Sequence, residues 1–206
     1  MNRTIGSMVA SVVWMGAVCA GPITPPPGPV SSTPGPEPRI AINATNTPGA
    51  GNSLYRITQP GSYYLTGNVT GVVGKHGIEI NASGVTLDLN GFDVVGVAAM
   101  GVFDGVTTDG IVVNNVEVKN GSVRNWGDKG VDFSSGTSRT ITVTNVRAAG
   151  NAATGIAVGE ASIVSGCTSS SNGGTGITAS TGSVIVGCTS TANTAFGISA
   201  STGCKI

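Results

Sequence analysis

The sequence predicts an all-β solenoid: a right-handed parallel β-helix with coils of about 21 residues, opened by a short β-stranded N-terminal cap. Three observations support this class. Residues recur at a fixed spacing in the C-terminal third of the chain. Each repeat holds short alternating runs separated by Gly, Ser and Asn, and no stretch of it shows helical periodicity. Finally, aromatic residues make up only 4% of the chain and glycines number 33, so the large side chains of an ordinary globular core are scarce.

Four sets of residues share the spacing of 21, which indicates stacked coils about 4.8 Å apart. Each repeated residue then lies on its counterpart in the next coil, and a repeated asparagine can pass amide hydrogen bonds along the stack. A leucine-rich repeat is disfavoured because the chain has only four leucines. The four sets are Asn151, Asn172 and Asn193; Gly155-Ile156, Gly176-Ile177 and Gly197-Ile198; Val146, Cys167 and Cys188; and Val143, Val164, Ile185 and Ile206.

Upstream of this repeat the coils are longer and less regular, as a right-handed coil tolerates. Two inward columns are expected to run through both regions, one of Ile78, Val131, Ile156, Ile177 and Ile198, the other of Ile80, Phe133, Val158, Ala179 and Ala200.

The chain divides into four expected segments. Residues 1–20 read as a secretory signal peptide, with Arg3, a short apolar core and a small-residue cleavage site; a lipidated Cys19 is the alternative. Residues 21–50 are a Pro-rich linker, 51–74 the cap strands, and 75–206 the β-helix. The protein is therefore expected to be secreted, periplasmic or on the cell surface. The coil at Ile206 looks incomplete, which predicts a truncated frame or self-association through an open C-terminal end.

Charge limits the classes of function. Charged residues are 10% of the chain and the formal net charge is zero, which argues against a nucleic-acid partner; no segment is long enough to span a membrane. A structural zinc site is not expected, since there is no C-x-x-C pair and one histidine. No Asp, Glu, Lys, Arg or His lies between Glu160 and Lys205, so any catalytic chemistry belongs between His76 and Arg147.

The turns "N-x-x-x-G-I" at Asn151, Asn172 and Asn193, the two "G-C-T-S" segments, and "PGSYYLTGN" and "GVTLDLNGF" resemble the pectate-lyase-like superfamily of right-handed parallel β-helices. More narrowly, the chain is similar to exported bacterial proteins built from parallel β-helix repeats. The resemblance covers residues 52–206 and implies a fold more than a function, because the superfamily includes lyases, hydrolases, epimerases, adhesins and binding scaffolds. Its hydrolases would show clustered aspartates and Gly-His-Gly, which this chain lacks; its lyases would need carboxylates for calcium and a basic side chain.

Two outward columns and one further set carry the candidate binding residues. The first column is His76, Asp109 and Lys129, and the second is Glu79, Val112 and Asp132. The further set is Asp88 with Glu117 and Lys119. A ladder of opposite surface charges is the simpler interpretation of all three.

Trp126 stands among Arg124, Asp128 and Lys129 and could stack on a sugar ring; the alternative is a Trp folded over a wide turn to cover apolar coil surface. Cys167 and Cys188 are expected to form a buried thiol ladder, with a disulfide between adjacent coils as the alternative.

These features favour an exported, non-catalytic β-helix that binds carbohydrate or a cell-envelope glycan, with no metal or other cofactor. The alternatives are a polysaccharide lyase or glycoside hydrolase, for which a lyase would add Ca²⁺, and a purely structural surface or adhesion protein.

Overall fold

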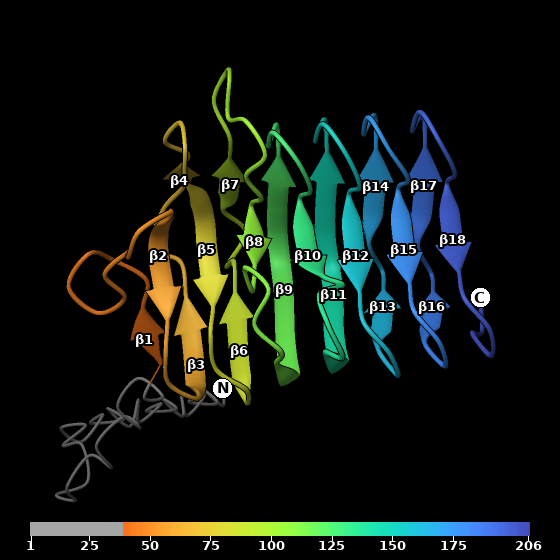
Figure 1. The fold of residues 1–206 in the computed structure, drawn as a ribbon, viewed down its shortest axis with the longest axis horizontal. Helices are drawn as coiled ribbons and strands as arrows, with labels where there is room; N and C mark the ends of the chain where they lie inside the picture. The colour runs from red at the N-terminus through yellow and green to blue at the C-terminus, as the bar shows by residue number, and fades with distance from the viewer. Residues whose placement is uncertain (1–38) are drawn as a thin grey trace, which may run out of the picture. The chain divides into compact units, whose positions relative to one another are not determined.

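A computed structural model describes residues 39–206, and in this range the chain forms eighteen β-strands and no helix. The predicted signal peptide and most of the Pro-rich linker lie outside the described residues. All strand pairings are parallel, and successive coils stack side by side along one axis (Figure 1). The all-β parallel solenoid expected from the repeat is confirmed.

Two sheets make up the walls of the coil. The seven-stranded sheet contains β2 (Ser53–Ile57), β5 (His76–Ile80), β8 (Val106–Thr107), β10 (Val131–Phe133), β12 (Ile156–Val158), β15 (Ile177–Ala179) and β18 (Ile198–Ala200), paired in that order. The eleven-stranded sheet contains β1 (Ile40–Ala41), β3 (Gly61–Tyr64), β4 (Val69–Thr70), β6 (Val85–Asp88), β7 (Asp93–Val95), β9 (Asn114–Arg124), β11 (Arg139–Ala149), β13 (Ile163–Ser165), β14 (Thr168–Ser170), β16 (Val184–Val186) and β17 (Thr189–Thr191).

The expected boundary between linker, cap and coil is wrong in the described part. Ile40 and Ala41, assigned to the linker, form β1 and pair with β3. The segment assigned to a separate cap supplies a complete coil, since β2 pairs with β5, β3 with β6 and β4 with β7. Its alternating runs already have the register of the later strands, so the solenoid begins before residue 53.

The corners of the coil lie at residues that tolerate a positive φ. The long strand β11 turns from one wall of the coil to the next at Asn145, whose φ is 54°. Its equivalents one and two coils later are Gly166 (φ 60°) and Gly187 (φ 61°), where the wall is split into separate strands. Asparagine and glycine are the residues that tolerate this left-handed conformation best. The repeated "G-C-T-S" is therefore a corner of the coil.

Inside the coil the apolar columns stack as expected. Val131 pairs with Ile156, Ile156 with Ile177, and Ile177 with Ile198, and the neighbouring column from Phe133 to Ala200 keeps the same register. Side chains of the first column are fully buried down to Ile177. Upstream the coils lengthen: equivalent residues are 25 apart between Trp126 and Asn151, and 28 apart between His76 and Asp104. The extra residues loop outward without breaking the columns.

The asparagine ladder is confirmed and has a counterpart in a column of glycines. Nδ2 of Asn151 donates to Oδ1 of Asn172 at 3.0 Å, and Nδ2 of Asn172 donates to Oδ1 of Asn193 at 2.9 Å. A Cβ at Gly155 would lie 2.7 Å from Nδ2 of Asn172, and one at Gly176 would lie 2.5 Å from Nδ2 of Asn193. The glycine of the repeated "G-I" is therefore required by packing: only a residue without a Cβ leaves room for the buried asparagine amide.

No helix within residues 39–206 is long and apolar enough to cross a membrane.

Candidate functional site

Ionisable side chains gather on the outer face of the seven-stranded sheet, over β2, β5, β8 and β10 and the turns that precede them. Two outward columns cross this face, and the structure corrects the predicted register in both. The first runs His76, Asp104, Lys129, with Asp104 where Asp109 was expected. The second runs Glu79, Thr107, Asp132, with Thr107 where Val112 was expected. The segment "FDGVTTDGIVV" contains two Gly-aliphatic pairs, and sequence reasoning chose the second; the strand begins after the first.

His76 lies almost buried at the start of β5, with 6% of its surface exposed. The backbone N–H of Asp104 donates to Nδ1 of His76 at 2.9 Å, which leaves the ring proton of the neutral tautomer on Nε2. Nε2 lies 3.6 Å from Oδ1 of Asp109, and Phe103 packs edge-on against the ring with centroids 5.0 Å apart. Burial lowers the pKa of His76 while the surrounding carboxylates oppose that shift, so the ring is neutral at pH 7.

Asp104 is the most perturbed acid of the cluster. It is 5% exposed, and Oδ1 accepts the backbone N–H of Lys129 at 2.9 Å. Burial raises the pKa of Asp104 to about 7, and the negative charges of Asp132 and Asp128 add to the rise; the hydrogen bond from Lys129 opposes it. This carboxyl therefore loses its proton near neutral pH and not near pH 4.

Two ion pairs hold the second column in place. Nζ of Lys129 lies 2.7 Å from Oδ2 of Asp132, and Nε of Arg56 lies 2.7 Å from Oε2 of Glu79. Oδ1 of Asp132 also accepts from the backbone N–H and the hydroxyl of Ser134. Burial pulls the pKa of Lys129 down, but its hydrogen bond to Asp132 and the nearby carboxylates leave it above the ordinary value. Arg56 and Lys129 are thus each paired with a carboxylate of the chain itself.

Trp126 is not a surface residue, and stacking on a sugar is excluded for it. The indole is 1% exposed and its Nε1 donates to the carbonyl of Val94 at 3.0 Å. Trp126 occupies the position in the coil that Asn151 takes one coil later, and its backbone N–H donates to Oδ1 of Asn151 at 3.1 Å. A Cβ at Gly77 would lie 2.9 Å from the indole, and one at Gly105 equally close. Gly77 and Gly105 thus leave room for the indole, just as the glycines of the later coils leave room for the asparagine amides.

The other candidate residues fall on different walls. Arg124 ends β9, where its NH2 nitrogen lies 2.9 Å from Oδ2 of Asp93. Asp88 and Lys119 are in register on β6 and β9, as expected of a ladder, but Asp88 pairs with Arg39 at 3.6 Å and Lys119 with Glu117 at 2.8 Å. Of the predicted residues, six belong to the cluster on the seven-stranded sheet: His76, Glu79, Asp109, Asp128, Lys129 and Asp132. Asp104 and Arg56 were missed.

The thiols of Cys167, Cys188 and Cys204 are free. Cys167 is buried in the predicted column, its Sγ donating to the carbonyl of Val143 at 3.4 Å, and burial raises the pKa of its thiol to about 11. Such a thiol is a small apolar side chain and not a nucleophile at neutral pH. Within residues 39–206 no group of three or more His, Cys, Asp or Glu is placed to hold a metal ion. The expectation that no cofactor is bound stays a prediction.

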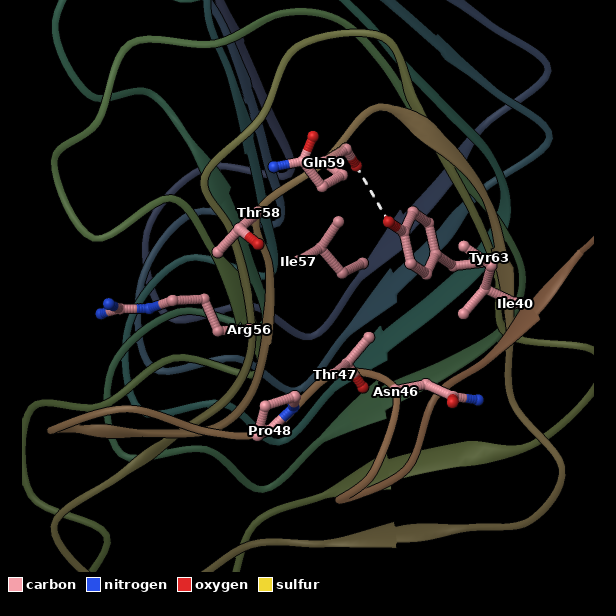
Figure 2. A pocket seen from close by; sticks show the side chains of 9 residues that line it. All are labelled: Ile40, Asn46, Thr47, Pro48, Arg56, Ile57, Thr58, Gln59 and Tyr63. Carbon is pink, nitrogen blue, oxygen red and sulfur yellow. Dashed lines mark hydrogen bonds between the residues drawn. The ribbon is translucent and has the colours of Figure 1, made fainter.

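A hollow of about 230 Å³ lies at the other end of β2, beside the first turns of the described chain. Figure 2 shows its lining, with the hydroxyl of Tyr63 donating to the carbonyl of Gln59 across one side and Arg56 directed away from the rest. The remaining lining residues are neutral: Ile40, Asn46, Thr47, Pro48, Ile57 and Thr58. Because the Arg56 guanidinium pairs with Glu79, the hollow itself is uncharged.

The stacked parallel coils, with an amide ladder inside and one ionisable face outside, define a β-solenoid of the parallel β-helix class. A family model described as the right-handed β-helix region matches residues 76–206, which is more than half of the chain. The chain belongs to this family. Neither the curated proteins nor the solved structures include a match.

Proposed function

We propose that this protein is exported and that the outer face of its seven-stranded sheet, over β2, β5, β8 and β10, binds carbohydrate without turnover. The observation that carries the proposal is that the ionisable side chains of this sheet are confined to its first coils, where ion pairs and hydrogen bonds fix them. Further along the same sheet the equivalent outward positions are Thr154, Ala157, Thr175 and Thr178, none of which carries a charge. Side chains already fixed by ion pairs and hydrogen bonds lose little entropy on meeting a ligand, which favours recognition of hydroxyl groups.

A second candidate is glycan cleavage with Asp104 as a general acid, in keeping with the superfamily resemblance. The observation that favours it is the pKa of about 7, which would supply a proton at neutral pH. Against it stands the burial of Asp104, which is 5% exposed, with its Oδ2 lying 3.5 Å from Nδ1 of His76. A general acid must come within hydrogen-bond distance of the leaving atom. Binding without turnover is therefore the better supported function.

The test compares binding and turnover on one polysaccharide panel, with and without calcium. Binding is measured by affinity electrophoresis, and turnover by new reducing ends or unsaturated products. We expect retardation on at least one glycan, no turnover, and loss of retardation in Lys129→Met. The matched control is Lys119→Met, since Lys119 also pairs with a carboxylate but lies on another wall. Turnover abolished by Asp104→Asn would replace the binding function by the second candidate, and a panel without any binding would favour a purely structural protein.

A further inference from the structure

Two thiols lie at equivalent positions of adjacent coils. Strands β14 and β17 pair in register, and Cys167 and Cys188 directly precede them (Figure 1). Both thiols are free; Cys167 is buried and Cys188 is half-buried. One coil earlier the same position is taken by Val146, which is fully buried. The column therefore changes from an aliphatic side chain to two stacked sulfur atoms.

The hydrogen bonds of the two thiols indicate how far apart their sulfur atoms lie. Each Sγ lies within hydrogen-bond distance of two backbone carbonyls, those of the residues 24 and 2 positions earlier. Both distances are 3.4 Å for Cys167 and 3.5 Å for Cys188. The two side chains therefore have the same conformation, and their sulfur atoms are separated by one strand spacing, about 4.8 Å.

This separation suits a bridging ion better than a disulfide. A disulfide needs sulfur atoms about 2.0 Å apart and Cβ atoms about 3.8 Å apart, so both side chains and both coils would have to move. Two metal–thiolate bonds in line, each about 2.3 Å as in zinc–thiolate sites, span about 4.6 Å. A soft ion that takes two collinear thiolate ligands therefore fits between the sulfur atoms with the coils in place.

The surroundings of the pair select the charge of the ion. No Asp, Glu, Lys, Arg or His occurs between Glu160 and Lys205, so the chain supplies no counter-charge to these coils. A monovalent ion between two thiolates would leave a negative charge there, which burial makes costly, whereas a divalent ion gives a neutral complex. Zn²⁺ requires four ligands, and no group of three or more His, Cys, Asp or Glu in residues 39–206 could hold a metal.

We infer that Cys167 and Cys188 form a two-coordinate site for a divalent thiophilic ion of the mercuric kind, held in line between adjacent coils. Binding replaces the two thiol protons by two sulfur–metal bonds and releases both protons to solvent, with no change of oxidation state. Cys188 is the point of entry, since it is the more exposed of the two. Burial raises the pKa of Cys167 to about 11, which slows its attack on a disulfide oxidant. The inference does not depend on carbohydrate binding.

The experiment offers Hg²⁺ to the full chain in a Cys19→Ser background, with glutathione as the competing thiol, and counts bound ions by native mass spectrometry. We expect one Hg²⁺ for each chain, with two protons lost. X-ray absorption should show two sulfur neighbours at about 2.3 Å. Mercury should also raise the melting temperature, because the bridge ties two coils together.

Cys167→Val and Cys188→Val remove one ligand each, and Val146 shows that the column accepts valine. Each variant should release Hg²⁺ at a glutathione concentration at least about tenfold lower, because the second thiolate is no longer held in place. Neither should gain melting temperature from mercury. Cys204→Ser is the matched control and should change the competition by less than about twofold, since the Cys204 thiol contacts the carbonyl of Ser180 in another column.

Retention of Hg²⁺ by either valine variant at the glutathione concentration that the parent chain withstands would overturn the inference, as would a single sulfur neighbour in the absorption spectrum. Binding of Zn²⁺ as tight as that of Hg²⁺ would contradict the two-coordinate geometry. Rapid formation of a Cys167–Cys188 disulfide in oxidised glutathione would show that the sulfur atoms are not held apart, which also refutes it. Unchanged circular dichroism of each variant separates loss of the site from loss of the fold.

Discussion

Asn172→Ala should be among the most destabilising single changes in the C-terminal coils. The side chain is 1% exposed and takes part in five hydrogen bonds. Its Nδ2 donates to Asn193, Ser169 and Ala148, and its Oδ1 accepts the backbone N–H and the Nδ2 of Asn151. Truncation leaves the backbone N–H of Asn151 buried without a partner. At about 1 kcal/mol for each bond, reduced because the bonds are not additive, we expect a loss of about 3–5 kcal/mol.

Denaturant unfolding measures the loss in free energy of unfolding. Native-state hydrogen exchange shows where the structure is weakened, because the backbone N–H of Asn151 donates directly to the Asn172 oxygen that the substitution removes. Asn193→Ala is the matched comparison. Asn193 has four such bonds but is half-exposed in the last coil, where water can replace them, so about 1–2 kcal/mol is expected. A loss below about 1 kcal/mol for Asn172→Ala, or unchanged exchange at Asn151, would refute the role given to the amide ladder.

Three further changes test the core and the cluster. Trp126→Ala should lower the free energy of unfolding by about 3–5 kcal/mol. Trp126→Phe should lower it by about 1–2 kcal/mol, since it removes only the donor to Val94 and part of the ring. In a Trp14→Phe background, blue-shifted tryptophan fluorescence that acrylamide does not quench would check the burial of the indole. Thr108→Val should raise the unfolding free energy by about 1 kcal/mol, because the Thr108 hydroxyl is fully buried and has no hydrogen-bond partner in the described residues; a destabilised variant would contradict this. The pKa of Asp104 is raised from 3.8 to about 7, so the folded state holds a proton that the unfolded state has lost. The free energy of unfolding should therefore fall as pH rises from about 4 to 7, by at most about 4 kcal/mol, and Asp104→Asn should flatten that slope. The lowered pKa of His76 adds a loss of stability as pH falls below the ordinary histidine value of 6.5.

The register of the irregular coils shows where sequence reasoning reached its limit. From Asn151 onward each column was predictable, because one period of 21 relates every member to the next. Between His76 and Asn151 the spacing changes from 28 to 25, and a Gly-aliphatic pair no longer identifies a strand by itself. Gly110, with a φ of 84°, lies in a turn, whereas Gly105 opens β8. What separates them is the indole of Trp126, which packs on Gly105 from elsewhere in the chain.

Residue type and repeat period were enough to predict the class of fold, the inward columns, the amide ladder and the part of the chain that carries the charge. Which charged side chains meet became clear from the folded chain alone. It moved Trp126 from the surface into the core, separated Asp88, Lys119 and Arg124 from His76, and joined Asp104 to the cluster. The physical reason is that a period specifies which residues stack, while the outward loops that set the neighbours of a charged side chain have variable lengths and leave no periodic trace.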